Sequence, residues 1–551
     1  MALFCPAVCG AEDSQRKFIQ TAAVVYGGNG EKHLQPEDAA ALARFDLLDI
    51  ARYRFSQING NTYAAIKAIN PQVQIYSYLE GQFTRNDQDG YHVSALSTLG
   101  RHNISRGHSM GSLNADNPQL FLLDALGQRI FNIAYSNPGE NAFSYLMDFG
   151  STSYLSYFLE SVRTDVVGRN WQADGLFVDD LSILPAAHLS GTPVVYPDQT
   201  SWITAMQQFS TGLAEGLQQE GLKMWANMGN TRNQAGADVW LALDAQAPRP
   251  DVVMEEGAFV VSWGSGDAQF LPEADWKRQV DLLGAIKNFK VTYLSHVDLD
   301  EDAEGIDNFG KRVTFWQAFY YALGSYLLGK NEIENNSYFM FFNSVYAYSL
   351  ARYWWFPEYD KIDLGAAQGE YAVTVHDGVN VYSRKFERGY VYVNPTSSKV
   401  SEVSLPEACL PVTHDAIEDL SSILPVSVVD LPPHSATILM HVPREPEADE
   451  PEPEKLKVTA SSRMINGQRV ILARVSMEPS GRSVSRARVR LQRRMSEQWK
   501  RKNGARTEFR SLATKRASAK GKARFKVSNG SGYFRLSSGA AQTFVRIRSR
   551  S

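Results

Sequence analysis

Up to about residue 300, the chain repeats one pattern of apolar and polar positions. A short β-branched or aromatic run ends in polar residues and is followed by a stretch with apolar residues at three- and four-residue spacing. Alternation of this kind predicts βα units. The predicted strands cover residues 18–26, 45–52, 73–80, 144–148, 175–180, 223–227, 251–256 and 290–297. Predicted helices include residues 61–69, 153–167, 202–220 and 273–288, and a further helix over 308–328 follows the eighth strand.

Eight such units predict an α/β fold, a (β/α)8 barrel with one long excursion after the third strand, over residues 81–143. A doubly wound open sheet is the competing architecture. No Gly-x-Gly-x-x-Gly motif follows a predicted strand, and the glycines of residues 27–30 lack the spacing of a dinucleotide-binding turn. The barrel is therefore the preferred interpretation.

Charge divides the chain into two parts. Residues 456–551 contain 25 Lys and Arg against three Asp and Glu, a net charge of +22, which leaves −26 on the rest. Residues 443–454 are acidic and rich in proline, as expected of an extended linker. The predicted domains are a barrel over 15–330, a barrel-packed segment with a small β-sandwich over 331–442, a linker over 443–455 and a basic module over 456–551.

Composition excludes several classes of protein. With 551 residues, 44% apolar residues and only three cysteines, the chain reads as a large globular protein rather than a disulfide scaffold. No apolar run approaches the roughly 18 residues that a membrane span needs. Residues 2–11 are apolar but short and lack a positively charged start, so no clear signal peptide is visible.

Carboxylates dominate the ends of the predicted strands. They are Glu80, Asp148, Asp179, Asp180, Glu255 and Glu256. In a (β/α)8 barrel these ends meet at the mouth that carries the chemistry. Converging carboxylates repel each other, so the arrangement offers the fold nothing and indicates a reaction. Two carboxylates across a sugar-sized cleft are what glycosidic bond cleavage needs.

Strand geometry separates some of these acids. Neighbouring residues of a strand point to opposite faces, and counting back from Asp179 through Phe177 to the small Gly175 gives one inward-facing set. We therefore expect Asp179 to be catalytic and Asp180 to cap a helix, support the site or contact substrate. The same argument separates Glu255 from Glu256 without saying which faces inward.

Other side chains near the predicted mouth are candidates for binding substrate. They are Tyr78, Trp225, Asn227, Trp263 and His296, together with Glu80, Asp180 and Glu255. Among these, Trp225 and Trp263 are candidates for stacking on a sugar. His296 stands alone, and no His-x-His follows the first strand, so we expect no metal and no organic cofactor. The aromatic runs at 338–342 and 353–356 are expected to pack between the barrel and the next domain.

Several motifs resemble those of a known group of enzymes. The run Asp174-Gly-Leu-Phe-Val-Asp179-Asp180 resembles the "DGVFLDD" strand of several barrel glycoside hydrolases, and Asp251-Val-Val-Met-Glu255-Glu256-Gly257 resembles their later "DGVMxEG" strand. Leu146-Met-Asp148 is similar to the aspartate strand before a helix. Together they resemble the hypothetical glycosyl hydrolase 15 group, related to the endo-α-1,4-polygalactosaminidase barrels, over roughly residues 40–440.

The resemblance implies a (β/α)8 barrel with acidic catalysts at strand ends, followed by a small β-sandwich. Carried over residue by residue, it points to Asp179 and Glu256, with Asp148 as a third acid. The chain departs from the pattern at Glu255, which duplicates the acid, and at Val252, where a glycine is usual. The duplication leaves the choice between Glu255 and Glu256 open.

The distal parts read as short alternating strands. Residues 365–442 fit the small sandwich, and residues 456–551 fit an immunoglobulin-like module similar to bacterial surface domains. The charge of +22 would attract an anionic polymer or cell surface, such as acidic exopolysaccharide or lipopolysaccharide. Nucleic acid is less favoured, since no recognised motif is present, and a merely solubilising basic surface stays open.

The sequence thus predicts a metal-independent glycoside hydrolase that cleaves a polysaccharide, an exopolysaccharide or amino-sugar polymer among the options. The alternative is a catalytically inactive barrel of the cell surface that binds polysaccharide. A polymer-degrading barrel joined to a surface-type module argues for an extracytoplasmic or secreted location.

Overall fold

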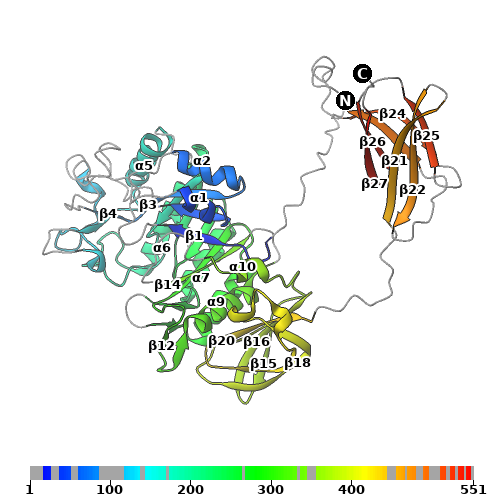
Figure 1. The fold of residues 1–551 in the computed structure, drawn as a ribbon. Coiled ribbons are helices and arrows are strands. Elements are labelled where there is room, and N and C mark those ends of the chain that lie inside the picture. Colours follow the sequence, from blue (N-terminus) through cyan, green and yellow to red (C-terminus); the bar gives the residue numbers. More distant parts are fainter. Residues whose placement is uncertain are drawn as a thin grey trace. The chain divides into compact units, whose positions relative to one another are not determined.

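The computed structural model describes most of the first 442 residues and seven strands beyond them. The described residues are 17–25, 36–50, 60–85, 117–136, 143–168, 173–262, 267–331, 336–343 and 355–442, with the backbone of strands between 455 and 547. The chain divides into two compact units, residues 1–442 and 443–551. The first unit contains a parallel barrel and an antiparallel sheet (Figure 1).

Eight parallel strands form the barrel (Figure 1). In spatial order they are β1 (Ala22–Val25), β2 (Leu47–Ile50), β3 (Gln74–Glu80), β6 (Gly175–Asp179), β7 (Lys223–Asn227), β8 (Val252–Glu255), β11 (Lys290–Val297) and β14 (Ser337–Asn343). A parallel bridge between Thr21 and Phe339 brings β14 back to the start of β1. The sheet therefore closes on itself, which leaves it without a free edge.

Helices connect the barrel strands along the chain. They are α1 (Pro36–Leu42), α2 (Gly60–Ile69), α5 (Thr152–Ser161) continued by a π-helix (Val162–Val167), α6 (Gln199–Gln219), α7 (Gln234–Asp244), α8 (Glu273–Ala285) and α9 (Phe315–Gly329). The first turn of α6 is closed by a capping box between Asp198 and Ser201. Among the residues that the structure describes, no helix is both long and apolar enough to cross a membrane.

Three pairs of short antiparallel strands lie in the connections between the barrel strands. They are β4 (Phe83–Arg85) with β5 (Ser144–Leu146), β9 (Val260–Val261) with β10 (Gln269–Phe270), and β12 (Glu304–Ile306) with β13 (Arg312–Thr314). The sequence pattern placed one of them wrongly, because residues 144–148 were expected to form the fourth barrel strand. The run is too short and pairs antiparallel with β4 instead.

The missing barrel strand is the aromatic run in β14, which was expected to be interdomain packing. All seven residues of β14 are buried, and the strand pairs in parallel with β11 from Ser337 to Asn343. A strand covered on both faces carries apolar residues without alternation, so it lacks the two-residue period by which half-exposed strands are found. The barrel consequently extends to Asn343.

The barrel interior is filled by alternate residues of the strands. Tyr76, Phe177 and Trp225 are fully buried there, and Trp225 meets the other two rings edge to face. Gly175 fits because a Cβ atom at this position would lie 2.3 Å from the carbonyl oxygen of Lys223. The lower and middle interior is therefore a packed core, and polar groups gather at the upper ends of the strands.

A six-stranded antiparallel sheet packs on α9. Its order is β15 (Ala372–His376), β16 (Val379–Phe386), β17 (Gly389–Asn394), β20 (Ser435–His441), β18 (Val400–Pro411) and β19 (Val426–Leu431), and a short helix α10 (Glu358–Lys361) precedes it. Because α9 lies between barrel and sheet, it is buried from Ala318 to Gly329 without a polar face.

The strands of this region are hydrogen-bonded into one sheet, and the small β-sandwich stays a prediction. Strand β18 carries register shifts between Val400 and Val403 and between Ser404 and Cys409. Such bulges bend a strand. The residues of β18 and β19 then cover the second face of β16 and β17, where they share a core with Val381 and Tyr390.

The second unit contains seven described strands in two antiparallel sheets. One sheet holds β21 (Lys455–Ile465), β22 (Gln468–Glu478) and β25 (Lys522–Val527), and the other holds β24 (Phe509–Arg516), β23 (Arg488–Arg494), β26 (Gly532–Ser538) and β27 (Ala541–Ile547). Two antiparallel sheets are compatible with the immunoglobulin-like arrangement, which stays a prediction.

One carboxylate in the barrel interior has no hydrogen-bond partner among the described residues. Asp49 in β2 is fully buried, and within this part of the chain neither of its carboxylate oxygens accepts a hydrogen bond. Burial, and to a smaller extent the charge of Asp179, raises the pKa of Asp49 well above its ordinary value. The folded protein therefore favours the protonated acid, whereas the unfolded chain releases this proton at a lower pH.

We expect Asp49→Leu to stabilise the protein, since leucine has nearly the same shape and needs no hydrogen bonds. A raised pKa in the folded state makes stability fall as pH rises above the ordinary aspartate range, and the variant removes that loss. The free energy of unfolding at pH 8 should increase by about 1–3 kcal/mol, with a smaller gain at pH 5. Thermal unfolding of both proteins at the two pH values measures this.

Asp244 provides the matched control, because it is buried but accepts hydrogen bonds from the backbone N–H groups of Lys287 and Asn288. Asp244→Leu should destabilise the fold at both pH values. A similar destabilisation by Asp49→Leu would show that Asp49 makes a stabilising contact.

Candidate functional site

The upper mouth of the barrel contains a cavity of about 170 Å³. It is lined by the turn after β6, the loop after β7 and the turn after β8, namely by Asp180, Ser182, Asn227, Met228, Gly229, Asn230, Arg232, Glu255, Glu256 and Gly257. These are the C-terminal ends of neighbouring parallel strands, the place where barrel enzymes hold their reacting groups.

Two carboxylates meet at this mouth through one amide. The Nδ2 atom of Asn227 donates hydrogen bonds of 2.7 Å to Asp179 Oδ1 and 2.7 Å to Glu256 Oε2. The two oxygens are therefore at most twice that distance, 5.4 Å, apart. Asp179 ends β6, Asn227 ends β7 and Glu256 follows β8, so three adjacent strands set this spacing.

The Asp179 carboxylate accepts a second hydrogen bond, from a tyrosine of the neighbouring strand β3. The hydroxyl group of Tyr78 in β3 donates a hydrogen bond of 2.7 Å to Asp179 Oδ2. The Tyr78 ring is buried and stacks on Phe177, with ring centroids 5.9 Å apart. With one donor on each oxygen, the carboxylate is held in a single orientation.

Glu256 lies in a different electrostatic environment. Burial raises the pKa of Glu256 to about 7, and the charge of Asp179 adds to the effect. The hydrogen bond from Asn227 opposes the shift, and Glu255 contributes a smaller increase. Near neutral pH a substantial fraction of Glu256 is thus protonated, as a general acid must be.

Glu255 is hydrogen-bonded to the surrounding loops rather than to this pair. Its Oε2 atom accepts hydrogen bonds of 2.6 Å from the Thr231 backbone and 2.5 Å from the Thr231 hydroxyl, while Oε1 accepts one of 2.8 Å from the backbone of Gly257. The side chain is buried. Glu255 thereby ties the turn that carries Glu256 to the loop that follows Asn227.

His296 lies at the upper end of β11 as a buried, neutral side chain. The backbone N–H of Ser262 donates to its Nδ1 atom over 3.2 Å, so the proton of the neutral ring is on Nε2. Burial lowers the pKa of His296 to about 4, and the ring stacks on Phe342. Within the described residues, no three His, Cys, Asp or Glu side chains are grouped as a metal ion would require.

Asp148 follows the short strand β5 and not a barrel strand. Its Oδ1 atom accepts a hydrogen bond from the hydroxyl group of Tyr196, which in turn accepts one of 3.0 Å from the backbone of Gly150. Among the described contacts, none joins Asp148 to Asp179 or Glu256. The structure therefore brings two of the three predicted catalytic acids together.

The other residues predicted to contact substrate lie in different parts of the barrel. Trp225 is fully buried with its Nε1 atom bonded to Thr292, so the expectation that it stacks on a sugar is wrong. Glu80 is buried at the end of β3, where it is the register partner of Asp179. Asp180 lines the cavity, while Trp263 lies outside the described residues.

Asp180 does not cap a helix. The helix after β6 begins only at Gln199 and is capped by Asp198. Asp180 instead adopts a φ of 50°, a left-handed conformation that is uncommon for residues other than glycine. The chain thereby turns sharply after Asp179, and the Leu181 backbone then donates to the carbonyl oxygen of Asn227 over 2.9 Å.

Two groups act in ways that the sequence pattern did not indicate. Tyr78 and Asn227 were expected to contact substrate, but both hold carboxylates of the site. The sequence did contain one signal: by the alternation of side chains along β3, β6 and β7, both residues face the barrel interior, as Phe177 and Asp179 do. Alternation does not show which of the inward-facing side chains are at the same height along the barrel axis and can form hydrogen bonds.

Three solved structures illustrate what the chain resembles at a distance. The trehalulose synthase MutB matches with 10% identity and a TM-score of 0.43, covering 77% of this chain and 99% of the other. The isomaltulose synthase from Klebsiella sp. LX3 matches with 9% identity and a TM-score of 0.43, covering 76% and 98%. SrfJ from Salmonella typhimurium matches with 9% identity and a TM-score of 0.36, covering 78% and 90%. Likeness this distant does not bear on the reaction.

No curated protein matches the sequence significantly. A family profile does match, that of hypothetical glycosyl hydrolase family 15, over residues 67–390. The match covers more than half of the chain and includes β3, the barrel strands from β6 to β14 and the pair at Asp179 and Glu256. This chain therefore belongs to hypothetical glycosyl hydrolase family 15.

Proposed function

We propose that the protein hydrolyses glycosidic bonds of a polysaccharide, with Asp179 and Glu256 as the reacting pair. The observation that carries this proposal is the shared donor: one amide nitrogen of Asn227 lies 2.7 Å from an oxygen of each carboxylate. Family membership supports the reaction class, and the spacing and unequal environments of the acids support their roles.

Asp179 is proposed as the nucleophile. A nucleophile must be held in position, and the hydrogen bonds from Tyr78 and Asn227 fix the Asp179 carboxylate in one orientation. In the first step an Asp179 oxygen attacks the anomeric carbon while Glu256 gives its proton to the departing glycosidic oxygen. The products are a free chain end and a glycosyl ester on Asp179.

Glu256 is proposed as the acid and then the base. Its raised pKa keeps a proton available near neutral pH for the leaving group. Once ionised, Glu256 takes a proton from a water molecule, whose oxygen attacks the anomeric carbon. The ester bond breaks, Asp179 leaves as a carboxylate, and Glu256 has regained its proton.

The separation of the pair supports retention of anomeric configuration. Retaining enzymes have carboxyl groups about 5–5.5 Å apart, whereas inverting enzymes need about 6.5–9.5 Å to fit a water molecule. The two oxygens that share the Asn227 nitrogen are no more than 5.4 Å apart, twice the 2.7 Å of each bond. A double displacement through Asp179 fits this spacing.

Retention is tested by recording proton NMR spectra during the first minutes of cleavage, before the anomers equilibrate. We expect the first product to have the anomeric configuration of the bond that was cut. A product of the opposite configuration would show direct attack by water and would remove Asp179 from the role of nucleophile.

A further inference from the structure

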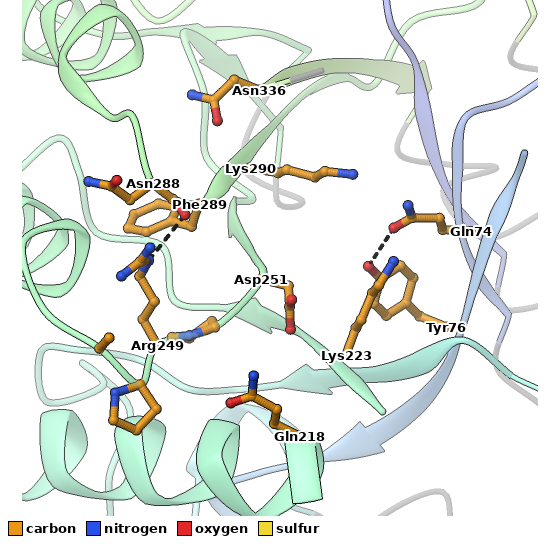
Figure 2. Close-up of a pocket in the computed structure, with 13 residues that line it drawn as sticks. Gln74, Tyr76, Gln218, Lys223, Arg249, Asp251, Asn288, Phe289, Lys290 and Asn336 are labelled. Carbon is orange, nitrogen blue, oxygen red and sulfur yellow. Dashed lines mark hydrogen bonds between the residues drawn. The ribbon is translucent and has the colours of Figure 1, made fainter. Parts of the chain in front are cut away.

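A second cavity lies at the opposite end of the barrel. It has a volume of about 440 Å³ and is lined by residues at the N-terminal starts of β3, β7, β8, β11 and β14. Figure 2 shows Lys223, Asp251 and Lys290 around its centre, with Gln74 and Asn336 at the rim. This cavity is more than twice as large as the one beside Glu256 and shares no residue with it.

Three aspartates at this end of the barrel have structural partners. Asp46, Asp174 and Asp251 each accept a hydrogen bond from the backbone of a neighbouring strand or its approach, with distances of 2.9, 2.7 and 2.9 Å. These bonds satisfy N–H groups at strand starts, so the carboxylates serve the fold.

Two of these aspartates also have a lysine of their own. Lys17 lies 3.9 Å from Asp46, and Lys67 lies 2.6 Å from Asp174. The third, Asp251, has no lysine or arginine within ion-pair distance among the described residues. Asp251 is therefore the carboxylate that offsets part of the positive charge of the residues lining the cavity.

Lys223 and Lys290 are the two lysines that line the cavity. Within the described part of the chain, neither ammonium group has a hydrogen bond or an ion pair, although Lys290 lies over the Tyr338 ring at 5.6 Å. Burial lowers the pKa of Lys290, the charge of Lys223 lowers it further, and the charges of Asp251 and Asp46 oppose the shift. Two lysines thus face one cavity without a hydrogen-bonded partner among the described residues.

The remaining charged groups leave the cavity positive. Arg249 donates hydrogen bonds to the carbonyl oxygens of Asn288 and Gln246. These neutral acceptors fix the position of the guanidinium group without neutralising its positive charge. Lys223, Lys290 and Arg249 are balanced among the lining residues only by Asp251. A net charge of +2 in a concave pocket attracts an anion.

We propose that this cavity binds a small molecule through an oxyanion, a phosphate or carboxylate group, held between Lys223 and Lys290. The volume of about 440 Å³ falls in the range of small-molecule sites and exceeds the needs of a bare phosphate ion. Gln74, Gln218 and Asn336 also line the cavity. Gln74 Oε1 accepts a hydrogen bond from Tyr76 and Asn336 Nδ2 donates one to the Ile286 carbonyl oxygen, which leaves the other amide atom of each side chain to meet hydroxyl groups of a monosaccharide-sized ligand. The oxyanion would neutralise the lysine pair without disturbing the aspartates.

Thermal unfolding of the full chain with added ligands tests the proposal. The probes are inorganic phosphate, glucose 6-phosphate, glucuronate and, as a neutral control, glucose. At saturation we expect the best oxyanion to raise the Tm by about 4 °C or more, and glucose to have no effect. A larger response to glucose 6-phosphate than to phosphate identifies a sugar phosphate, and a preference for glucuronate identifies a carboxylate.

Two variants and a matched control make the result specific. Lys223→Met and Lys290→Met should each abolish the Tm increase while leaving the ligand-free Tm close to that of the wild type, because neither ammonium group has a hydrogen bond or ion pair among the described residues. Lys287→Met, an exposed lysine close in sequence to Asn288, should respond like the wild type. Anions bound by the basic residues 456–551 would act equally in all four proteins.

Acetylation with mass-spectrometric mapping gives a second readout that does not depend on stability. Saturating oxyanion should reduce the acetylation rate of Lys223 and Lys290 at least about fivefold and leave Lys287 unchanged. Equal Tm increases in the wild type and both pocket variants, or no protection of either lysine, would overturn the proposal. Both readouts are independent of turnover and therefore of the function proposed for Asp179 and Glu256.

Discussion

Asp179→Asn is expected to abolish turnover, with kcat lowered by about 10³-fold or more. The amide has almost the same size as the carboxylate and can still meet Tyr78 and Asn227 after rotation, but it is a poor nucleophile. Substrate affinity should change little, since binding depends on the rest of the cleft. Initial rates and equilibrium binding on the same polysaccharide measure the two effects separately.

Asp148→Asn is the matched control for this variant. Its carboxylate is bonded to Tyr196 and has no described contact with the reacting pair. We expect a loss of less than about tenfold in kcat. Comparable losses in the two variants would mean that Asp148 takes part in the reaction and that the assignment of the pair is incomplete.

Glu256→Gln is expected to make the rate depend strongly on the leaving group. Polysaccharide cleavage should fall by about 10²- to 10⁴-fold, because no acid protonates the departing oxygen. Aryl glycosides with strongly acidic phenols leave without protonation, so formation of the glycosyl ester on Asp179 should be nearly unaffected. A pre-steady-state burst of phenol, followed by slow turnover, measures the separation of the two steps.

The pH dependence of the wild type follows from the same carboxyl group. Glu256 must be protonated to act as an acid, and its pKa is raised to about 7. Activity limited by the first step should therefore decline as pH rises through about 7. The alkaline decline should be absent for the activated substrate with Glu256→Gln. If the decline persists in this variant, another group controls it.

Much of the barrel could be predicted from the sequence because its strands obey simple rules. The runs at β3, β6, β7, β8 and β11 end in polar residues, and helices of regular period separate them. Strand β14 was missed because all its residues are buried and it lacks a polar end before Asn343. Asp148 was predicted to be catalytic because it ends a strand, but that strand, β5, pairs with β4 and is not part of the barrel sheet.

The site was only partly accessible to the same reasoning. Alternation of side chains pointed to Asp179, because Phe177 and Asp179 share the inward face of β6. It could not separate Glu255 from Glu256, which differ by one position at the end of β8 and take opposite directions there. Hydrogen bonds across strands, such as those from Asn227, depend on the height of each residue along the barrel.

Buried charge was the least predictable feature. Asp49 lies within an apolar strand, and nothing in its sequence neighbours reveals that both oxygens lack hydrogen bonds from the described residues. Lys223 and Lys290 begin two strands that are far apart in sequence, and only the closed barrel brings them to one cavity. These features follow from tertiary packing and have no local signature.

The most direct test of the central claim is the release of reducing ends from a panel of neutral, amino-sugar and acidic polysaccharides. The wild type, Asp179→Asn and Glu256→Gln are compared, and binding of each polymer is measured in parallel. We predict that the wild type cuts at least one polymer, that Asp179→Asn binds it without cutting, and that Glu256→Gln cuts it far more slowly. Cleavage that survives Asp179→Asn would contradict the mechanism. Equal binding of one polymer by all three proteins with no cleavage would show a polysaccharide-binding barrel instead of an enzyme.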